Sequence, residues 1–149
     1  MTVKKDGVRI RKARQADAPR IAVLSSQLGY PATTKEMAVR LRQALRARDG
    51  VCLVAETNEG GVIGWVHASV TPLLEVERRA EVNGLVVEEK VRSRGAGWLL
   101  LEAAENWARK RGCKGMSVRS NVIRERAHAF YLRNGYEHYK TQKAFRKSL

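Results

Sequence analysis

Six consecutive residues have the composition of a phosphate-binding turn: Arg92-Ser93-Arg94-Gly95-Ala96-Gly97. An apolar run ends just before them at Val87, and a helix-like run that opens with Trp98 follows them. Glycine lets a backbone approach a ligand closely, and the N–H groups of a helix's first turn attract anions. The two arginines add fork-shaped donors suited to phosphate oxygens. The alternative reading is an ordinary strand-to-helix turn with solvated arginines.

The elements that would position this turn are typical of one α+β domain spanning residues 1–149. The sequence predicts strands over 8–13, 51–55, 62–70, 77–87 and 114–120, helices over 18–28, 34–45, 96–110 and 123–133, and a final pair of short strands over 136–138 and 143–147. Asp17 and Thr33 or Thr34 are expected to cap the first two helices. The strand at 114–120 follows a helical crossover, so we expect it to run parallel to the strand before the turn. The earlier strands form an antiparallel meander.

Charge is distributed unevenly along the 149 residues, whose formal net charge is +14. Residues 1–50 hold 12 basic and 4 acidic side chains, residues 51–108 hold 5 and 9, and residues 109–149 hold 12 and 2. Basic ends around an acidic middle favour a polyanionic ligand at one site and a cationic ligand at another. The alternative is that most of these charges only keep the protein in solution.

Several classes of protein are disfavoured by composition. The longest apolar runs are too short to span a membrane, and the first residues do not form a signal peptide, so we expect a cytoplasmic protein. Cys52 and Cys113 lie in apolar or strand-like surroundings, which favours reduced thiols over a disulfide. The three histidines, His67, His128 and His138, have no metal-ligand spacing, so we expect no metal.

Three features at matching spacing resemble the GNAT superfamily of acyl-CoA-dependent N-acetyltransferases. The turn at 92–97 has the family's form Gln/Arg-x-x-Gly-x-Gly/Ala. The run Ala127-His128-Ala129-Phe130-Tyr131-Leu132-Arg133-Asn134-Gly135-Tyr136 is similar to the family's last helix, in which Phe130-Tyr131 is the informative pair. Asn121 stands where an asparagine often ends the preceding strand. The resemblance covers nearly the whole chain and implies a mostly antiparallel sheet with one splayed parallel strand pair and about four helices.

The resemblance implies a site for acetyl-CoA. The pyrophosphate would lie on the backbone N–H groups between Arg94 and Trp98, at the helix N-terminus. The pantetheine arm would pair with the backbone of the preceding strand, where an N–H near Leu85 would polarise the thioester carbonyl. The cofactor-binding residues implied are Leu85, Val86, Val87, Arg92, Ser93, Arg94, Gly95, Ala96, Gly97, Trp98 and Asn121.

The implied chemistry is direct attack of a primary amine on a thioester in a ternary complex. A proton must leave the amine, and the departing thiolate benefits from a proton donor. Tyr131, at the position of the family tyrosine, is the candidate general acid; alternatively, its hydroxyl only hydrogen-bonds the sulfur or a backbone group. Glu81 is the candidate general base, with ordered water as the alternative. Glu75, Glu77 and Glu88 belong to the same acidic region and are weaker candidates for the base.

The acceptor is less well determined by the sequence. The acidic middle favours a cationic small-molecule or peptide amine, with Glu75 and Glu77 as weak candidates for contacting it. Tyr30 lies between the first two predicted helices, where it either borders the acceptor or belongs to the core. The alternative function is a GNAT-like module that binds nucleic acid or a partner, which is disfavoured because no aromatic cluster interleaves the basic runs. Members of this fold are often homodimers.

Overall fold

The computed structural model describes residues 4–149, with the side chains of Lys4, Lys5 and residues 92–94 outside the description. The chain divides after Arg119 into two units. The first unit contains the sheet and the first three α-helices, and the second, Ser120–Leu149, contains the fourth.

The first unit is organised around a six-stranded sheet whose strands lie in chain order. The strands are β1 (Lys4–Lys5), β2 (Val8–Lys12), β3 (Gly50–Thr57), β4 (Val62–Val70), β5 (Arg79–Val87) and β6 (Gly115–Val118). Neighbouring strands are antiparallel from β1 to β5, whereas β5 and β6 are parallel. The predicted mixed sheet with one parallel pair is therefore confirmed.

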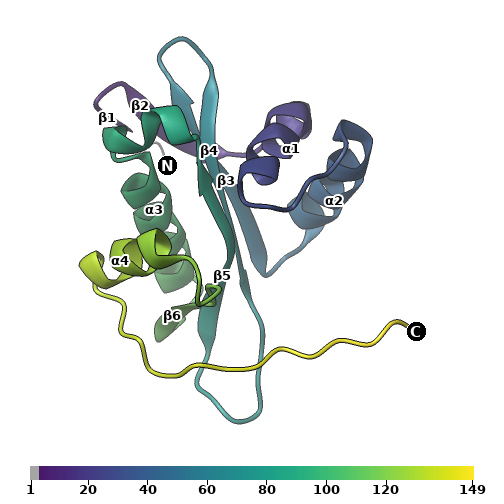
Figure 1. The fold of residues 1–149 in the computed structure, drawn as a ribbon, viewed down its shortest axis with the longest axis vertical. Helices are drawn as coiled ribbons and strands as arrows, with labels where there is room; N and C mark the ends of the chain where they lie inside the picture. Colours follow the sequence, from purple (N-terminus) through teal and green to yellow (C-terminus); the bar gives the residue numbers. More distant parts are fainter. Residues whose placement is uncertain (1–3) are drawn as a thin grey trace. The chain divides into compact units, whose positions relative to one another are not determined.

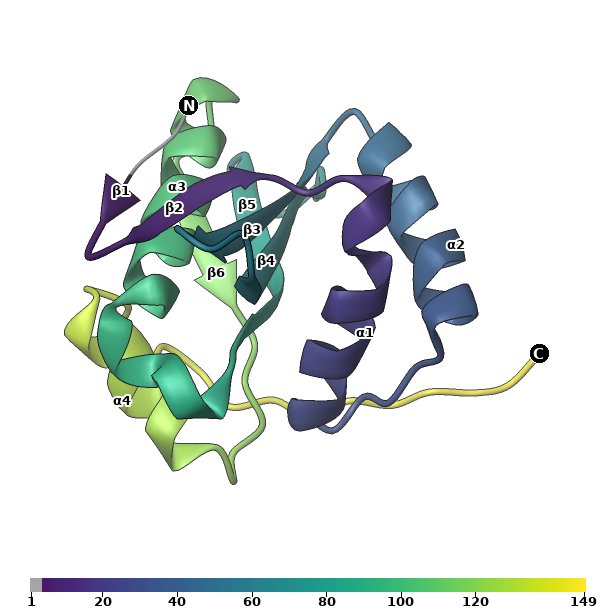
Figure 2. The same ribbon diagram turned by 90° about the horizontal axis from the view of Figure 1, so that it is seen from above.

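Helices cover both faces of this sheet (Figures 1 and 2). Helices α1 (Ala18–Gln27) and α2 (Thr34–Arg46) lie on one face, and α3 (Ala96–Lys110) lies on the other. The core under α1 and α2 includes Leu24, Leu41 and Val54, and a second core under α3 includes Val70 and Ala108. Two 3₁₀ helices, η1 (Gln15–Asp17) and η2 (Glu89–Arg94), precede α1 and α3, and α4 (Glu125–Arg133) lies in the second unit.

Helix α2 begins with the capping box that the sequence indicates. The Thr33 hydroxyl accepts a hydrogen bond from the Glu36 backbone N–H, and the Glu36 carboxylate accepts one from the Thr33 N–H. This reciprocal pair satisfies two backbone donors that the helix cannot pair internally. Leu41 is buried against the sheet, while the four arginines of this region, Arg40, Arg42, Arg46 and Arg48, form an exposed face.

A β-bulge in β5 determines which side chains lie on which face of the sheet. His67 of β4 pairs with Gly84, but the next residue, Ala68, pairs with Val82, so Asn83 is an extra residue on β5. Strand side chains alternate between faces, and one inserted residue reverses the alternation beyond it. Gly84 therefore shares the α1/α2 face with Trp65, and Glu81 shares that face with Ser69.

Two sequence-based expectations are wrong. Residues 136–138 and 143–147 form no strands: the chain from Tyr136 to Leu149 has no regular secondary structure. Alternating side chains favour a strand, but a strand also needs a hydrogen-bonded neighbour. Asp17 precedes α1 as expected, yet its side chain does not cap that helix. It accepts instead from the Arg14 backbone N–H and from the Arg11 guanidinium group.

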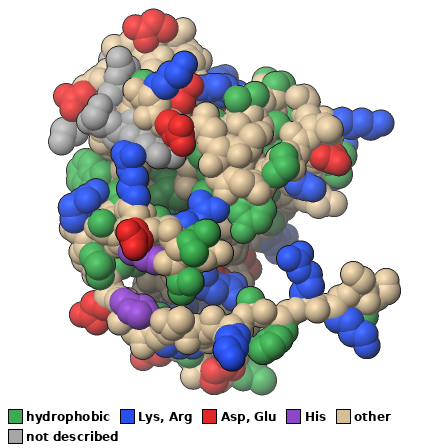
Figure 3. Space-filling model, in the orientation of Figure 1, with side chains coloured by type: hydrophobic (Ala, Val, Ile, Leu, Met, Phe, Trp, Pro, Cys, Tyr) green, Lys and Arg blue, Asp and Glu red, His purple; other side chains and the backbone are tan. Residues whose placement is uncertain are grey.

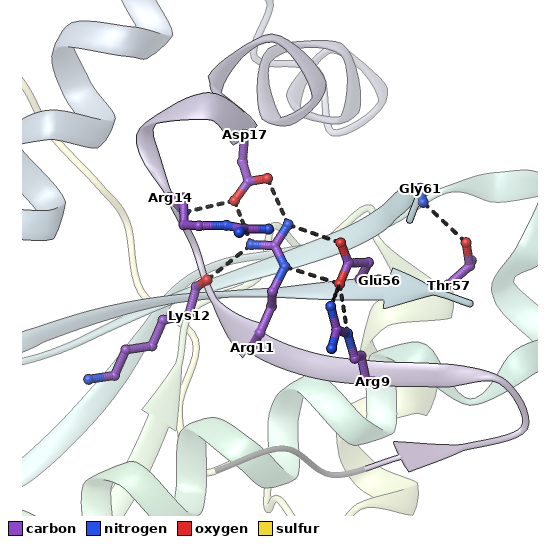
Figure 4. Close-up of polar contacts among 8 residues, drawn as sticks. All are labelled: Arg9, Arg11, Lys12, Arg14, Asp17, Glu56, Thr57 and Gly61. Atoms are coloured by element: carbon purple, nitrogen blue, oxygen red, sulfur yellow. Dashed lines mark hydrogen bonds and ion pairs between the residues drawn. The ribbon is translucent and has the colours of Figure 1, made fainter. Parts of the chain in front are cut away.

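That Asp17 contact belongs to an ion network between β2, β3 and the start of α1 (Figure 4). Arg11 binds Asp17 with two hydrogen bonds of 2.9 Å and also contacts Glu56 of β3 at 3.2 Å. Arg9 lies opposite Glu56 in the β2–β3 register and binds its carboxylate at 2.6 Å. Both carboxylates are buried, and the arginines hold the pKa of each below its ordinary value despite the opposing effect of desolvation.

Candidate active site

The N-terminus of α3 has the local geometry of an anion site. Gly95 precedes the helix with a φ of 73°, in the left-handed region that glycine enters without strain. Gly95 is the N-cap residue and has no side chain of its own to cap the helix, and a Cβ at this position would meet no described atom within 4 Å. The residues before it form η2 rather than the expected open loop. The side chains of Arg92, Ser93 and Arg94, which were predicted to bind phosphate, lie outside the part of the chain that the structure describes.

Strand β5 leads to this turn and extends past its parallel partner. Strand β6 pairs with β5 only from Arg79 to Val82, whereas β5 continues to Val87. The Glu88 N–H bonds to Ile63 of β4, and from there the antiparallel alternation makes Val86 and Trp65 a hydrogen-bonded pair. The same alternation turns the backbone N–H and C=O groups of Leu85 away from β4, as the expected pantetheine contact requires. The backbone N–H and C=O groups of Val86, by contrast, point toward β4.

The α1/α2 face carries a row of polar side chains on β4, β5 and the β6 region, here called the polar strip. It consists of His67, Ser69, Glu81, Asn83, Ser117 and Arg119. Ser69 and Ser117 lie beside Glu81 from the two neighbouring strands. The Asn83 amide donates to the Ser69 hydroxyl at 2.8 Å. The bulge is what brings Glu81 into this row.

Glu81, the predicted base, is held by an arginine that the sequence analysis did not connect to it. Arg119 binds both carboxylate oxygens, with Nε at 2.8 Å and Nη2 at 3.2 Å. Glu88 is also paired, because Arg20 of α1 reaches it at 2.8 Å. Glu75 and Glu77 lie exposed in the connection between β4 and β5. The acidic middle of the sequence is thus partly neutralised in the fold.

His67 is a titratable residue of the polar strip, and no catalytic role for it was predicted from the sequence. It is half-buried and pairs across the strands with Gly84, the residue before Leu85. Its ring has no hydrogen bond to a described residue, and burial lowers the pKa of His67, which favours the neutral imidazole. Glu81 lies four residues from Leu85, roughly 13 Å along an extended strand. Only the pairing register of β4 with β5 places His67 close to Leu85, so this role could not be predicted from the sequence.

Beside His67, the indole ring of Trp65 covers Gly84. A Cβ at Gly84 would lie 2.6 Å from the Trp65 Cη2 atom and 2.8 Å from Cζ3. Only glycine therefore fits under this ring. The Trp65 Nε1 atom is buried and has no hydrogen-bond partner among the described residues.

In the second unit, Tyr131 lies on α4 between two other aromatic rings. Its ring meets those of Phe130 and Tyr136 edge to face, with centroids 5.3 and 5.6 Å apart. Burial raises the pKa of Tyr131 to about 12, so the phenol keeps its proton at neutral pH. Asn121 forms the turn into α4, where its side-chain oxygen accepts from the Ile123 N–H. The amide nitrogen of Asn121 is not used in that turn.

Tyr30 is not part of the core. Its side chain is 67% exposed after α1, so the alternative that it packs inside the domain is wrong. The position stays compatible with a surface that borders an acceptor. Within residues 4–149 as described, no helix has the length and apolar character needed to cross a membrane. No cluster of three potential metal ligands occurs among the same residues.

Comparison with known proteins identifies the family. The model of the acetyltransferase (GNAT) family matches residues 12–136, so this chain belongs to that family. It is an N-acetyltransferase that uses acetyl-CoA as the acetyl donor. The α3 N-terminus led by Gly95 fits this coenzyme, whose pyrophosphate needs backbone donors and an open approach.

Relatives and solved structures support the same assignment. An uncharacterized N-acetyltransferase of Bacillus subtilis, YhfO, is 31% identical over 133 residues, covering 86% of this chain and 89% of that protein. An aminoalkylphosphonate N-acetyltransferase of Salmonella typhimurium is 39% identical over 119 residues, covering 78% and 70%. The aminoglycoside N-acetyltransferase AAC(6')-Iy, solved in complex with CoA, superposes with a TM-score of 0.85 at 18% identity over 100% of both chains. At that identity the last comparison shows the fold alone.

Proposed function

We propose that this enzyme transfers an acetyl group from acetyl-CoA to a primary amine of a cationic small-molecule or peptide acceptor. Transfer occurs by direct attack within a ternary complex. The observation that carries the proposal is the extension of β5 past β6, shortly before the glycine-led N-terminus of α3. An extended thioester arm and a pyrophosphate need these two features in this order along the chain.

The donor would be held mainly by backbone groups. The N–H groups of Ala96 and Gly97 face the pyrophosphate, with the positive end of the α3 dipole behind them. The pantetheine arm runs along the outward edge of β5, where the Leu85 N–H donates to the thioester carbonyl. That bond strengthens as negative charge develops on the oxygen. Asn121 binds a pantetheine amide through its side-chain amide nitrogen.

Acetyl transfer requires that one proton leaves the amine and that another proton reaches the departing sulfur. The neutral amine attacks the thioester carbon, the C–N bond forms, and the C–S bond then breaks to release the thiolate of CoA. Tyr131 supplies a proton to that sulfur, and its pKa of about 12 means that the hydroxyl carries this proton at neutral pH. A base on the polar strip takes the proton from the attacking amine.

Two residues of the polar strip compete for the role of base. Glu81 carries the negative charge that attracts an ammonium group, but its carboxylate is already bound at both oxygens by Arg119. His67 is neutral and lies across from Gly84, one residue from Leu85. We assign proton removal to one of these two groups, directly or through a water molecule. A pH–rate comparison separates them.

The acceptor class rests on charge. Glu75 and Glu77 are exposed in the connection between β4 and β5, and no ion pair to a described residue neutralises them. They favour an acceptor with several ammonium groups, such as an aminoglycoside-like aminosugar. Arg119 introduces the competing possibility of an amine that also carries an anionic group, as aminoalkylphosphonates do. The two classes differ in net charge and are easily compared.

The decisive experiment measures release of free CoA thiol with a panel of amines. The panel contains an aminosugar with several ammonium groups, spermidine, a lysine peptide and 2-aminoethylphosphonate, with reactions lacking acceptor as controls. Turnover with the cationic amines, at a kcat/KM at least tenfold above that with the phosphonate, supports the proposal. Preference for the phosphonate overturns the cationic acceptor, and no turnover with any amine in the panel removes the support for this acceptor class.

A nucleic-acid-binding role is not favoured, because the family match accounts for the glycine turn without it. We infer a cytoplasmic location, for which two cysteines outside any disulfide, Cys52 and Cys113, are typical. Cys52 is buried in the sheet, and burial raises the pKa of its thiol to about 12, so the reactive thiolate is disfavoured.

A further inference from the structure

Helix α1 is bonded to the residue that follows β5. The Arg20 guanidinium donates through Nε to the Val62 carbonyl oxygen at 2.7 Å and through Nη2 to the Glu88 carboxylate at 2.8 Å. The register of β4 with β5 ends at the pair Gly64 and Val87. Arg20 therefore joins the two strands just beyond the point where their own pairing stops. Figure 3 shows acidic and basic side chains close together on the upper part of this face of the molecule.

Glu88 has a partner for its backbone N–H, its backbone carbonyl and its side chain. The N–H donates to the Ile63 carbonyl oxygen at 2.8 Å, and the Glu88 carbonyl oxygen accepts from the Val91 N–H at 3.1 Å. The carboxylate is half-buried and forms the ion pair with Arg20. The position and direction of the chain are therefore fixed where it leaves β5.

A second α1 side chain holds the next residue. The Glu89 N–H donates to the side-chain oxygen of Gln27 at 3.3 Å. Arg20 and Gln27 are seven positions apart, close to two helical turns, so they lie on one face of α1. We call these two side chains the α1 clasp. It holds two consecutive residues, Glu88 and Glu89, at the start of η2.

The clasp acts at the point where the chain changes faces of the sheet. Helix α1 lies on one face and α3 on the other, and η2 connects β5 to the Gly95 turn at the start of α3 (Figure 2). Backbone N–H groups bind an anion most tightly when they are already in place, because ordering them on binding costs entropy. A fixed start for η2 leaves fewer conformations for the turn that follows it.

We propose that Arg20 and Gln27 are positioning residues for acetyl-CoA. By holding the start of η2 they keep the Gly95 turn in the conformation that binds the pyrophosphate. This inference rests on the proposed function, which places the pyrophosphate at that turn. It also gives Glu88, one of the weaker candidates for the base, a different role, because its carboxylate anchors Arg20. If the ion pair only stabilised the fold, its loss would have no specific effect on coenzyme affinity.

The first test is the affinity for acetyl-CoA, measured by isothermal titration calorimetry without an acceptor. We expect Arg20→Ala to raise Kd about tenfold and Gln27→Ala about threefold, because the first loses a charged hydrogen bond and the second a neutral one. Gln15→Ala is the matched control: the Gln15 side chain donates to the Ala38 carbonyl oxygen at 2.8 Å, which bonds η1 to α2 without touching η2. Its Kd should equal that of the parent enzyme.

Variants of Glu88 show whether the ion pair itself is responsible. Glu88→Gln keeps a side-chain oxygen for Arg20 and should bind acetyl-CoA nearly as well as the parent, whereas Glu88→Ala should resemble Arg20→Ala. The double variant Arg20→Ala/Glu88→Ala should be no weaker than Arg20→Ala alone, because one interaction is lost only once. A Kd within twofold of the parent in Arg20→Ala, or an equal loss in Gln15→Ala, overturns the proposal.

Gly95→Val separates failure of the clasp from failure of the proposed coenzyme site. If Gly95→Val loses acetyl-CoA binding while Arg20→Ala keeps it, the site stands and the clasp is overturned. If Gly95→Val binds like the parent, the pyrophosphate lies elsewhere and both are overturned. Gly112→Val, with the same strain at the other end of α3, is the control for folding.

Hydrogen exchange of residues 88–97 measures the order of the turn directly. In the absence of coenzyme, mass spectrometry of peptides covering these residues should show severalfold faster exchange in Arg20→Ala than in the parent. Exchange in the same peptides should be unchanged in Gln15→Ala. Equal exchange in Arg20→Ala and the parent overturns the proposal.

Discussion

Tyr131 is the residue whose proposed role depends most directly on its ionisation. The hydroxyl is protonated at neutral pH even at the ordinary tyrosine pKa of 10, and burial raises the pKa of Tyr131 further, to about 12, so a proton is available for a departing thiolate. We expect Tyr131→Phe to lower kcat by about 10²-fold or more while KM for acetyl-CoA changes little. Steady-state kinetics measure both constants. A kcat within threefold of the parent enzyme would assign the hydroxyl to binding or packing.

His67 and Glu81 are separated by the pH dependence of kcat/KM. If His67 is the base, the acidic limb reports its lowered pKa, and His67→Asn removes that limb while Glu81→Gln keeps it. The stability of the folded enzyme provides an independent readout. Because the folded pKa lies below the ordinary value of 6.5, stability from neutral His67 is complete above that pH and declines as pH falls. If the acidic limb is unchanged in His67→Asn, the general base is Glu81 or a water molecule.

At the scale of elements, β5 depends on a glycine under Trp65. In Gly84→Ala the new Cβ would come within 2.6 Å of the indole ring, so either the ring or the strand must shift. We expect a loss of unfolding free energy of about 1–3 kcal/mol. Gly61→Ala is the control, because its Cβ would make an ordinary contact of 3.5 Å with Thr57. Urea unfolding measures both variants, and equal stability would mean that the ring moves freely.

The ion network joins β2, β3 and the start of α1, and it predicts acid sensitivity. The folded pKa values of Asp17 and Glu56 lie below their ordinary values of 3.8 and 4.5. Their contribution is therefore complete above about pH 5 and is lost as pH falls through 4.5 and below. Glu56→Gln leaves Arg9 and Arg11 short of a partner, with a loss of about 2 kcal/mol at pH 7 and a weaker dependence on pH below 5. Thermal unfolding of the parent enzyme and of Glu56→Gln from pH 3 to 8 measures both effects. Curves of Tm against pH that run parallel for the two proteins would contradict the prediction.

At the scale of the whole molecule, binding of acetyl-CoA is expected to increase the free energy of unfolding. At a hundredfold excess over Kd the native state gains about 2.7 kcal/mol, which for a chain of this size raises Tm by roughly 5–10 °C. Gly95→Val and Gly112→Val both introduce strain at φ values near 75°, at opposite ends of α3, and both lower the basal Tm. Only Gly95→Val should abolish the shift with acetyl-CoA. A retained shift in Gly95→Val would place the pyrophosphate elsewhere.

Much of the local structure follows from the sequence alone. The start of α3 directly after Gly95, the Thr33 cap of α2 and the parallel β5–β6 pair are encoded by neighbouring residues or by the crossover rule, and these predictions are confirmed. The GNAT family and its coenzyme follow in the same way, because the motif around Gly95 is contiguous. Such features are readable because their energetics depend on the next few residues along the chain.

Other features were decided only by tertiary structure. The bulge at Asn83 sets which face carries Glu81, the ion pair joins Glu81 to Arg119 from 38 positions away, and His67 lies beside Leu85 only through the β4–β5 register. The state of residues 143–147 is of the same kind, because a strand exists only where a neighbour supplies its hydrogen bonds. Strand register and edge pairing depend on contacts between distant residues. For that reason the acetyl donor could be identified from the sequence. The environment of the base and the conformation of residues 143–147 could be determined only from the fold.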